Sequence, residues 1–440
     1  MSHRLGGAWL AIPAAVLAAA VAAASAFAPL VALGMVGAAI VLGMVLANAT
    51  ALLLVLIAAF PWDDALAFPT ETVSVVKILG ALVLVGYLIR LFAAGEPLAL
   101  PAPLGWLAVF SLLVLVSTLA SPDLAASIPK TLRYLLFASF FFLYVQLVRT
   151  REMVRASLRV LLASLSAASV WALFTFLTQG YGLASGPVGD PNDFGYLLAT
   201  ALPLAAYLIA EDRRYRTLWL LATLPIVAAL FATLSRGALV GMLALVVWAV
   251  WTRRVPIGGV LAAGAASLAI VVLALAFWGP LIGERVQAKG KVATANVQSR
   301  EALWKGALRM AGDRPLLGIG PGRFGDASPE YVIDEVIKLE EPVVHNSYLE
   351  VLAELGLPAL LAFLGFLAAS WQRTRATIAR AEREGDHEGL RLGIAVQASL
   401  VVAIVAGLFI SAQVIIPMWL LAALASVVAA TRPRAVAAAL

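Results

Sequence analysis

The chain has 440 residues, of which 62% are hydrophobic and only 13% are charged. A water-soluble domain of this composition would expose far too much apolar surface, so a soluble globular fold is excluded. The net charge of +6 does not indicate nucleic-acid binding, because most Lys and Arg residues lie in short loops between apolar runs. The absence of cysteine excludes disulfides and any cysteine-based metal site or nucleophile.

The apolar residues fall into runs of roughly 17–25, the length that crosses the hydrocarbon layer as a helix. The sequence therefore predicts an all-α polytopic membrane protein with about 12–14 transmembrane helices. The Ala-rich first run resembles a signal peptide, but a second apolar run follows at once, which favours an uncleaved first helix. The predicted spans are 8–28, 29–47, 49–61, 73–93, 104–120, 131–148, 157–178, 193–210, 216–234, 237–252, 256–279, 346–371, 392–411 and 413–430.

The loops between these spans differ in charge from one side to the other. If every span crosses, the basic loops fall on one side, which predicts that this side and both termini are cytoplasmic. The opposite loops are mostly neutral or acidic, and they include one long segment, 280–345. The predicted organisation is an N-terminal transmembrane bundle (1–279), a long periplasmic loop containing short helices (280–345) and C-terminal transmembrane helices (346–440).

Within the long loop, Ser299 to Ala311 places Leu303, Trp304 and Leu308 at helical spacing. An amphipathic helix is predicted there, with Asp313-Arg314-Pro315 ending it.

His345 is the one histidine that the topology leaves outside the cytoplasm, since His3 and His387 fall on the inner side. A lone histidine without carboxylates at ligand spacing does not make a metal site, so no metal and no cofactor is predicted. One neutral imidazole can act as a general base, because its pKa lies near ambient pH. The alternative is an interfacial histidine at the start of a helix that Asn346 and Ser347 would cap.

Arg236 and Arg300 are cations on the side that otherwise avoids positive charge. Two arginines there are suited to bind a phosphate or diphosphate bidentately. The alternative for Arg236 is snorkelling to lipid phosphate. Lys130 and Arg133, spaced i,i+3 on the same side, would add to the positive field, although their predicted position at a helix start is typical of a solvated face.

Glu350 and Glu354 lie one turn apart inside an apolar span, where carboxylates are expensive. Helical geometry directs them away from His345, so we expect them to pack against a polar neighbour rather than to orient the imidazole. Asp190 and Asp193 lie at a predicted helix start, where carboxylates favour the helix dipole.

The segment Gly320-Pro321-Gly322-Arg323-Phe324-Gly325 formally matches the dinucleotide-binding pattern GxGxxG. That pattern requires a preceding strand in a βαβ unit, which an exported loop does not supply, so a turn is predicted instead.

Several segments of the chain resemble signature segments of the O-antigen ligase/polymerase family, mainly over residues 185–365. They are Gly189-Asp190-Pro191-Asn192-Asp193, Ser235-Arg236-Gly237, Ser299-Arg300 to Trp304, Pro315-Leu316-Leu317-Gly318-Ile319-Gly320 and His345-Asn346-Ser347-Tyr348-Leu349.

This resemblance implies a metal-independent, inverting glycosyltransferase with a GT-C-like membrane fold in the bacterial inner membrane, acting on the periplasmic face. Its donor would be a glycan on undecaprenyl diphosphate. The family's essential histidine corresponds to His345 and its diphosphate-binding arginines to Arg236 and Arg300. Candidate supporting residues are Lys130, Arg133, Asn192, Trp304, Asn346 and Tyr348.

The shared motifs do not separate a ligase from a polymerase. A ligase transfers the glycan to a sugar hydroxyl of lipid A–core, whereas a polymerase uses another lipid-linked repeat as acceptor, and the ligase is favoured. A secondary transporter is the alternative from a different class, but the sequence lacks the internal repeats that such proteins tend to show. The expected partners are therefore the lipid-linked donor, a glycan acceptor and membrane lipids, with no nucleic acid.

Overall fold

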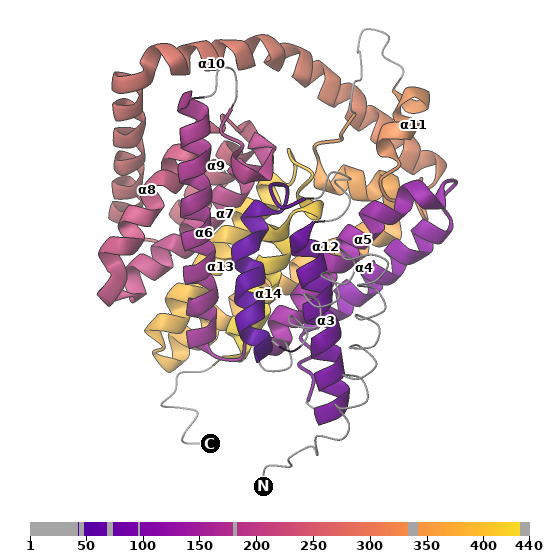
Figure 1. Cartoon of the computed structure of the whole chain (residues 1–440), viewed down its shortest axis with the longest axis horizontal. Coiled ribbons are helices and arrows are strands. Elements are labelled where there is room, and N and C mark those ends of the chain that lie inside the picture. Colours follow the sequence, from indigo (N-terminus) through magenta and orange to yellow (C-terminus); the bar gives the residue numbers. More distant parts are fainter. Residues whose placement is uncertain are drawn as a thin grey trace, which may run out of the picture.

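The computed structural model describes residues 43, 48–67, 74–95, 97–178, 183–332 and 342–431, and these form an all-α bundle (Figure 1). The one extended pairing among them is an isolated bridge between Ala67 and Ser74. In chain order the labelled elements are η1 (Phe60–Trp62), α3 (Val75–Ala94), α4 (Ala102–Leu119), α5 (Leu124–Leu147), α6 (Arg151–Thr178), η2 (Gly186–Val188), α7 (Pro191–Glu211), η3 (Arg213–Tyr215), α8 (Arg216–Ala232), α9 (Arg236–Thr252), α10 (Ile257–Asp313), α11 (Phe324–Tyr331), α12 (Ser347–Glu384), α13 (His387–Ala406), η4 (Ala412–Val414) and α14 (Ile416–Ala430).

Nine helices in the described part of the chain are long and apolar enough to cross a membrane. Three shorter apolar helices accompany them: Asn48–Trp62, α9 and α14. The prediction of an all-α polytopic membrane protein is confirmed. The predicted spans 8–28 and 29–47 lie outside the described residues, apart from Gly43.

The centre of the bundle is built around α14 and the helices that enclose it. Trp419 of α14 is fully buried and stacks on Phe137 of α5, with ring centroids 6.0 Å apart and an interplanar angle of 12°. Phe366 of α12 lies against the same ring, at 5.5 Å. Outer helices instead leave apolar side chains exposed, such as Trp251 of α9. Such a surface is stable only against hydrocarbon, which is as apolar as the side chains themselves.

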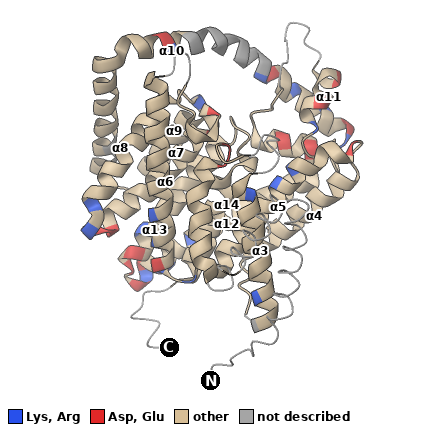
Figure 2. Ribbon diagram, in the orientation of Figure 1, with Lys and Arg blue, Asp and Glu red and all other residues tan. Residues whose placement is uncertain are grey.

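Charged residues gather mainly toward the two ends of the bundle (Figure 2). At one end, which we call the basic end, the loops that precede α6, α8 and α13 meet. Buried Arg151 donates to Asp386 at 2.7 Å, and Arg155 pairs with Glu388 at 2.7 Å. The opposite end, which we call the His345 end, contains the starts of α7, α9 and α12 and the C-terminal part of α10. Three of the loops predicted to be basic, those before α6, α8 and α13, therefore lie at the same end of the bundle.

The first half of segment 280–345 is helical as far as Asp313. It forms the part of α10 that follows the kink at Trp278 and arches across the His345 end (Figure 1). A single break interrupts the helix at Trp278 (φ −130°, ψ 21°), two residues before Pro280. No further proline occurs until Pro315, so the helix continues to Asp313, as predicted for its end. Only α11 is a short separate helix in the described part of this segment.

Candidate active site

Arg236 is held at the His345 end by the tight packing of the turn before α9. Ser235 caps the helix by accepting a hydrogen bond from the Ala238 amide at 3.4 Å. A Cβ at Gly195 of α7 would lie 2.8 Å from the Ser235 Cβ, and one at Gly237 would lie 3.1 Å from Ile410. The turn is therefore wedged between α7 and the segment after α13, which leaves the Arg236 side chain exposed.

Arg300 approaches from the opposite side, on the arch of α10. Its side chain is partly buried, one turn before Trp304. The Trp304 indole N–H donates to the Val344 carbonyl at 2.9 Å, which fixes α10 to the residue before His345. Burial lowers the pKa of Arg300, and the positive charge of Arg236 lowers it further, so the two guanidinium groups are close enough to repel. Both stay charged, since guanidinium is not deprotonated in proteins.

Among the described residues, neither arginine has a carboxylate partner. Within the described ranges, no carboxylate lies within salt-bridge distance of Arg236 or Arg300. Two uncompensated cations held near each other are costly unless an anion binds between them. The arrangement is therefore suited to a ligand that carries at least one phosphate.

His345 directly precedes Asn346, the N-cap of α12, and has a left-handed backbone conformation (φ 50°) that is uncommon for a residue other than glycine. Burial lowers the pKa of its imidazole, and the charge of Arg300 lowers it further. Asp190 and Glu350 act in the opposite direction and are outweighed. The imidazole is therefore neutral at neutral pH, the state required of a general base.

The candidate supporting residues at this end have structural roles. The Asn346 side chain caps α12, accepting from the amides of Tyr348 (3.0 Å) and Leu349 (3.1 Å). The Tyr348 hydroxyl donates to the Ile404 carbonyl at 2.7 Å, which ties α12 to α13. Asn192 is the second residue of α7, and its amide is bound by the capping carboxylate of Asp190 at 2.6 Å. These contacts fix the backbone on both sides of His345.

Lys130 differs from the expected solvated residue. The helix α5 begins at Leu124, so Lys130 lies within it rather than at its start, and its side chain is largely buried. Its ammonium pairs with Glu350 and lies 2.7 Å from Glu354. The expectation that these carboxylates pack against a polar neighbour is confirmed. Because the two carboxylates neutralise Lys130, its charge does not add to the positive field expected from the sequence. Arg133, by contrast, is exposed and lines a cavity described below.

Sequence reasoning missed how the glycine-rich turn is used. Gly356 breaks α12 (φ 82°, ψ 175°), and the segment after α10 fills the break. The Ile319 amide donates to the Ala353 carbonyl, the Gly320 amide to the Glu354 carbonyl and the Leu357 amide to the Pro315 carbonyl, at 3.0, 3.0 and 2.7 Å. The tripeptide Gly356-Leu357-Pro358 inside a helical pattern could have indicated this break in the helix.

The predicted turn itself is confirmed, because Gly318, Gly320 and Gly322 all have positive φ and no strand precedes them in the described chain. The described residues also contain no group of three or more His, Asp or Glu side chains that could hold a metal ion.

Comparison with known families gives one match. Residues 220–364 match a family model described as O-antigen ligase. The matched region contains Arg236, Arg300, His345 and the loop that fills the break in α12. No curated protein sequence matches the chain.

Proposed function

We propose that this chain, whose residues 220–364 match the O-antigen ligase family model, is an inverting glycosyltransferase that acts on lipid-linked glycans. The donor is a glycan on undecaprenyl diphosphate, and the acceptor is a sugar hydroxyl of lipid A–core. The His345 end faces the periplasm, and the protein is a multi-pass component of the bacterial inner membrane with both termini in the cytoplasm. No nucleotide sugar is available there, so the sugar arrives already activated.

The reaction follows from three side chains. The acceptor oxygen attacks C1 of the donor sugar from the face opposite the leaving group, and the bond between C1 and the phosphate oxygen breaks. The acceptor proton passes to neutral His345. Undecaprenyl diphosphate leaves with the bonding electron pair, and Arg236 and Arg300 neutralise the charge that develops on it. Because the two guanidinium groups supply this charge, the transfer needs neither a metal ion nor a cofactor.

The observation that carries the proposal is a pair of guanidinium groups that have no carboxylate partner among the described residues, near an imidazole of lowered pKa. A secondary transporter would gather its polar groups near the middle of the membrane. The groups described here lie at one end of the bundle, where a substrate that is half lipid and half sugar presents its diphosphate.

The test is transfer by a His345→Ala variant, reconstituted with a lipid-linked glycan and lipid A–core. We expect a loss of about 10²–10⁴-fold in rate, the usual contribution of a general base. The matched control is His387→Ala, an exposed histidine at the basic end, which should transfer at the wild-type rate. Wild-type transfer by folded His345→Ala would refute the assignment.

Mass spectrometry of lipid-linked glycans in a deletion strain separates the two family activities. Long glycan chains that accumulate on the lipid carrier indicate a ligase. Single repeat units indicate a polymerase and would replace the acceptor proposed here. An unchanged pool contradicts both activities.

A further inference from the structure

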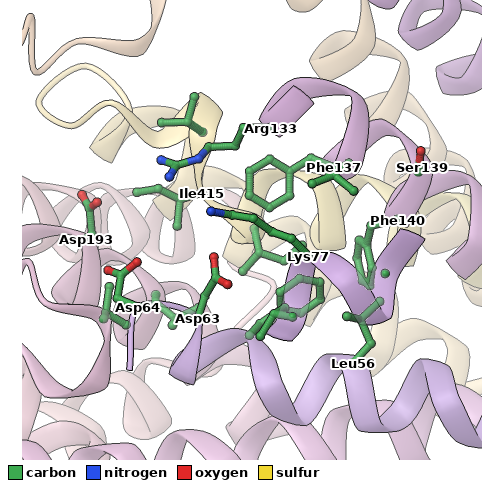
Figure 3. A pocket seen from close by; sticks show the side chains of 18 of the residues that line it. Leu56, Asp63, Asp64, Lys77, Arg133, Phe137, Ser139, Phe140, Asp193 and Ile415 are labelled. Atoms are coloured by element: carbon green, nitrogen blue, oxygen red, sulfur yellow. The ribbon is translucent and has the colours of Figure 1, made fainter. Parts of the chain in front are cut away.

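A cavity of about 120 Å³ lies among α3, α5 and α7 (Figure 3). It is enclosed by the helix Asn48–Trp62 with its following turn, by α3, α5 and α7, and by the segment 414–416. A single water occupies about 30 Å³ in the liquid. The cavity is thus too large for one ordered water and suits part of a sugar ring.

Its lining combines charges of both signs with aromatic rings. Three carboxylates face it, from Asp63, Asp64 and Asp193, together with the cations Lys77 and Arg133 (Figure 3). Phe60, Phe137 and Phe140 form an apolar wall.

Two of these charged groups lack a partner. Within the described residues, neither the Asp193 carboxylate nor the Arg133 guanidinium makes a hydrogen bond or an ion pair. Asp63, in contrast, accepts a hydrogen bond from the Ser74 hydroxyl. A free carboxylate and a free guanidinium on the wall of one cavity are typical of groups held ready for a ligand.

The helices α5 and α7, which line the cavity, also bear residues that interact with groups near His345. Arg133 lies one turn beyond Lys130, whose ammonium pairs with Glu350 of α12. The segment 414–416 follows Ser411, whose hydroxyl donates to the same Glu350 carboxylate. Asp193 lies one turn beyond the capping Asp190, whose charge acts on His345. The cavity is therefore linked to the His345 site through Glu350 and through the first turn of α7.

The charge of the cavity decides which part of the substrates fits it. A diphosphate would meet three carboxylates and only two cations, and this negative balance disfavours an anion. A polyprenyl tail would offer no hydrogen-bond partner to Asp193 or Arg133, so its apolar contact with these charged groups is unfavourable. A sugar ring satisfies both requirements, since its hydroxyls donate to carboxylates and accept from a guanidinium while its C–H face packs on aromatic rings.

The sequence positions of the lining residues indicate whether the cavity binds the donor sugar or the acceptor sugar. Every residue that lines it falls outside residues 220–364, whereas Arg236, Arg300 and His345 all fall inside. The three residues proposed to act on the donor thus lie in the region that the family model matches. The residues that line the cavity lie in regions that this model does not cover. We infer that the cavity binds the acceptor sugar, with Asp193 and Arg133 as specificity-determining residues; this inference rests on the proposed transfer reaction.

The experiment measures initial transfer rates while acceptor and donor concentrations are varied separately. Asp193→Asn and Arg133→Gln should each raise the KM for the acceptor by about tenfold to a hundredfold, the usual effect of losing a hydrogen bond to a charged group. The KM for the donor should stay unchanged. Glu330→Gln, which alters an exposed carboxylate of α11 outside the cavity, serves as the matched control.

A third variant tests the volume of the cavity without changing its charge. Gly80 lines the cavity, and a Cβ there would be 3.9 Å from Leu56, an ordinary contact. Gly80→Val should therefore fold and should raise the acceptor KM by partly filling the space.

The two proposals fail differently. If the wild-type protein transfers no glycan to any acceptor, the proposed function is wrong. If it transfers glycan while the folded cavity variants keep the wild-type acceptor KM, or raise only the donor KM, the acceptor site is wrong.

Discussion

Arginine and lysine are not equivalent at positions 236 and 300 if both side chains bind one diphosphate. Lysine offers a point charge and no planar fork, so Arg236→Lys and Arg300→Lys should each lower the transfer rate by about tenfold to a hundredfold. Because both act on one group, the double variant should lose less than the two single losses combined.

The measurement is a double-mutant cycle on initial rates, with donor binding measured alongside. Arg309→Lys is the control, since this exposed arginine of α10 donates to the Tyr331 carbonyl away from the pair. Small, additive losses with unchanged donor affinity would contradict a shared diphosphate.

The pH dependence of transfer depends on His345, which must be neutral to accept a proton. Its pKa is lowered in the free protein, so the acid limb of kcat/KM should lie below the ordinary histidine value of about 6.5. Bound diphosphate brings negative charge and raises the pKa of His345, so the acid limb of kcat should lie at higher pH. Coincident limbs in the two profiles would show that the imidazole and the diphosphate are not neighbours.

At the scale of residues, topology and charge single out His345, Arg236 and Arg300 in the sequence. The structure brings Arg300 near both Arg236 and His345, and the roles of the three residues in transfer stay predictions. The pairing of Lys130 with Glu350 could not be predicted from the sequence. The two residues lie 220 positions apart, and hydrophobic periodicity does not show which helices pack together. For the same reason the cavity beside Asp193 was not predicted.

At the scale of elements, the break in α12 depends on Gly356, where the helix is interrupted, and on Gly318, in the segment that fills the break. A Cβ at Gly318 would lie 2.2 Å from the backbone carbon of Glu354, in a position with φ 64°. Gly318→Ala should therefore destabilise the protein by more than about 3 kcal/mol, since backbone atoms have to move. Thermal unfolding in detergent measures the change.

Gly312 provides the matched control, because it lies in α10 with nothing within 4 Å of a Cβ. Gly312→Ala should be neutral or stabilising by up to about 1 kcal/mol. A Gly318→Ala protein with the wild-type melting temperature would contradict the described packing.

Helix existence was predictable, whereas helix limits were less so. Pro129 and Lys130 disfavour a membrane span, so the predicted helix began at residue 131, but Asp123 caps an earlier start by accepting from the Ala126 amide at 3.1 Å. Likewise α12 extends to Glu384, well beyond the predicted end at 371, because a helix continues past the apolar region that hydropathy detects.

At the scale of the whole molecule, the proposed orientation places the two ends of the bundle in different compartments. The chain contains no cysteine, so single introduced cysteines report position without background. A membrane-impermeant maleimide should label Lys305→Cys, on the exposed face of α10, in cells whose outer membrane alone is permeabilised. Arg383→Cys, near the basic end, should be labelled only after the inner membrane is opened. The reverse pattern would invert the proposed topology.

The filled break in α12 also limits how such proteins can be recombined. Three backbone hydrogen bonds join segment 315–320 to residues 353–357, and no side chain is the donor or acceptor in any of them. A chimera that takes one segment from a relative of different loop length would leave amide and carbonyl groups unpaired at a buried position. Crossover points placed before Pro315 and after Pro358 keep both partners from one parent, so the exchangeable unit is defined by main-chain pairing rather than by the boundaries of helices.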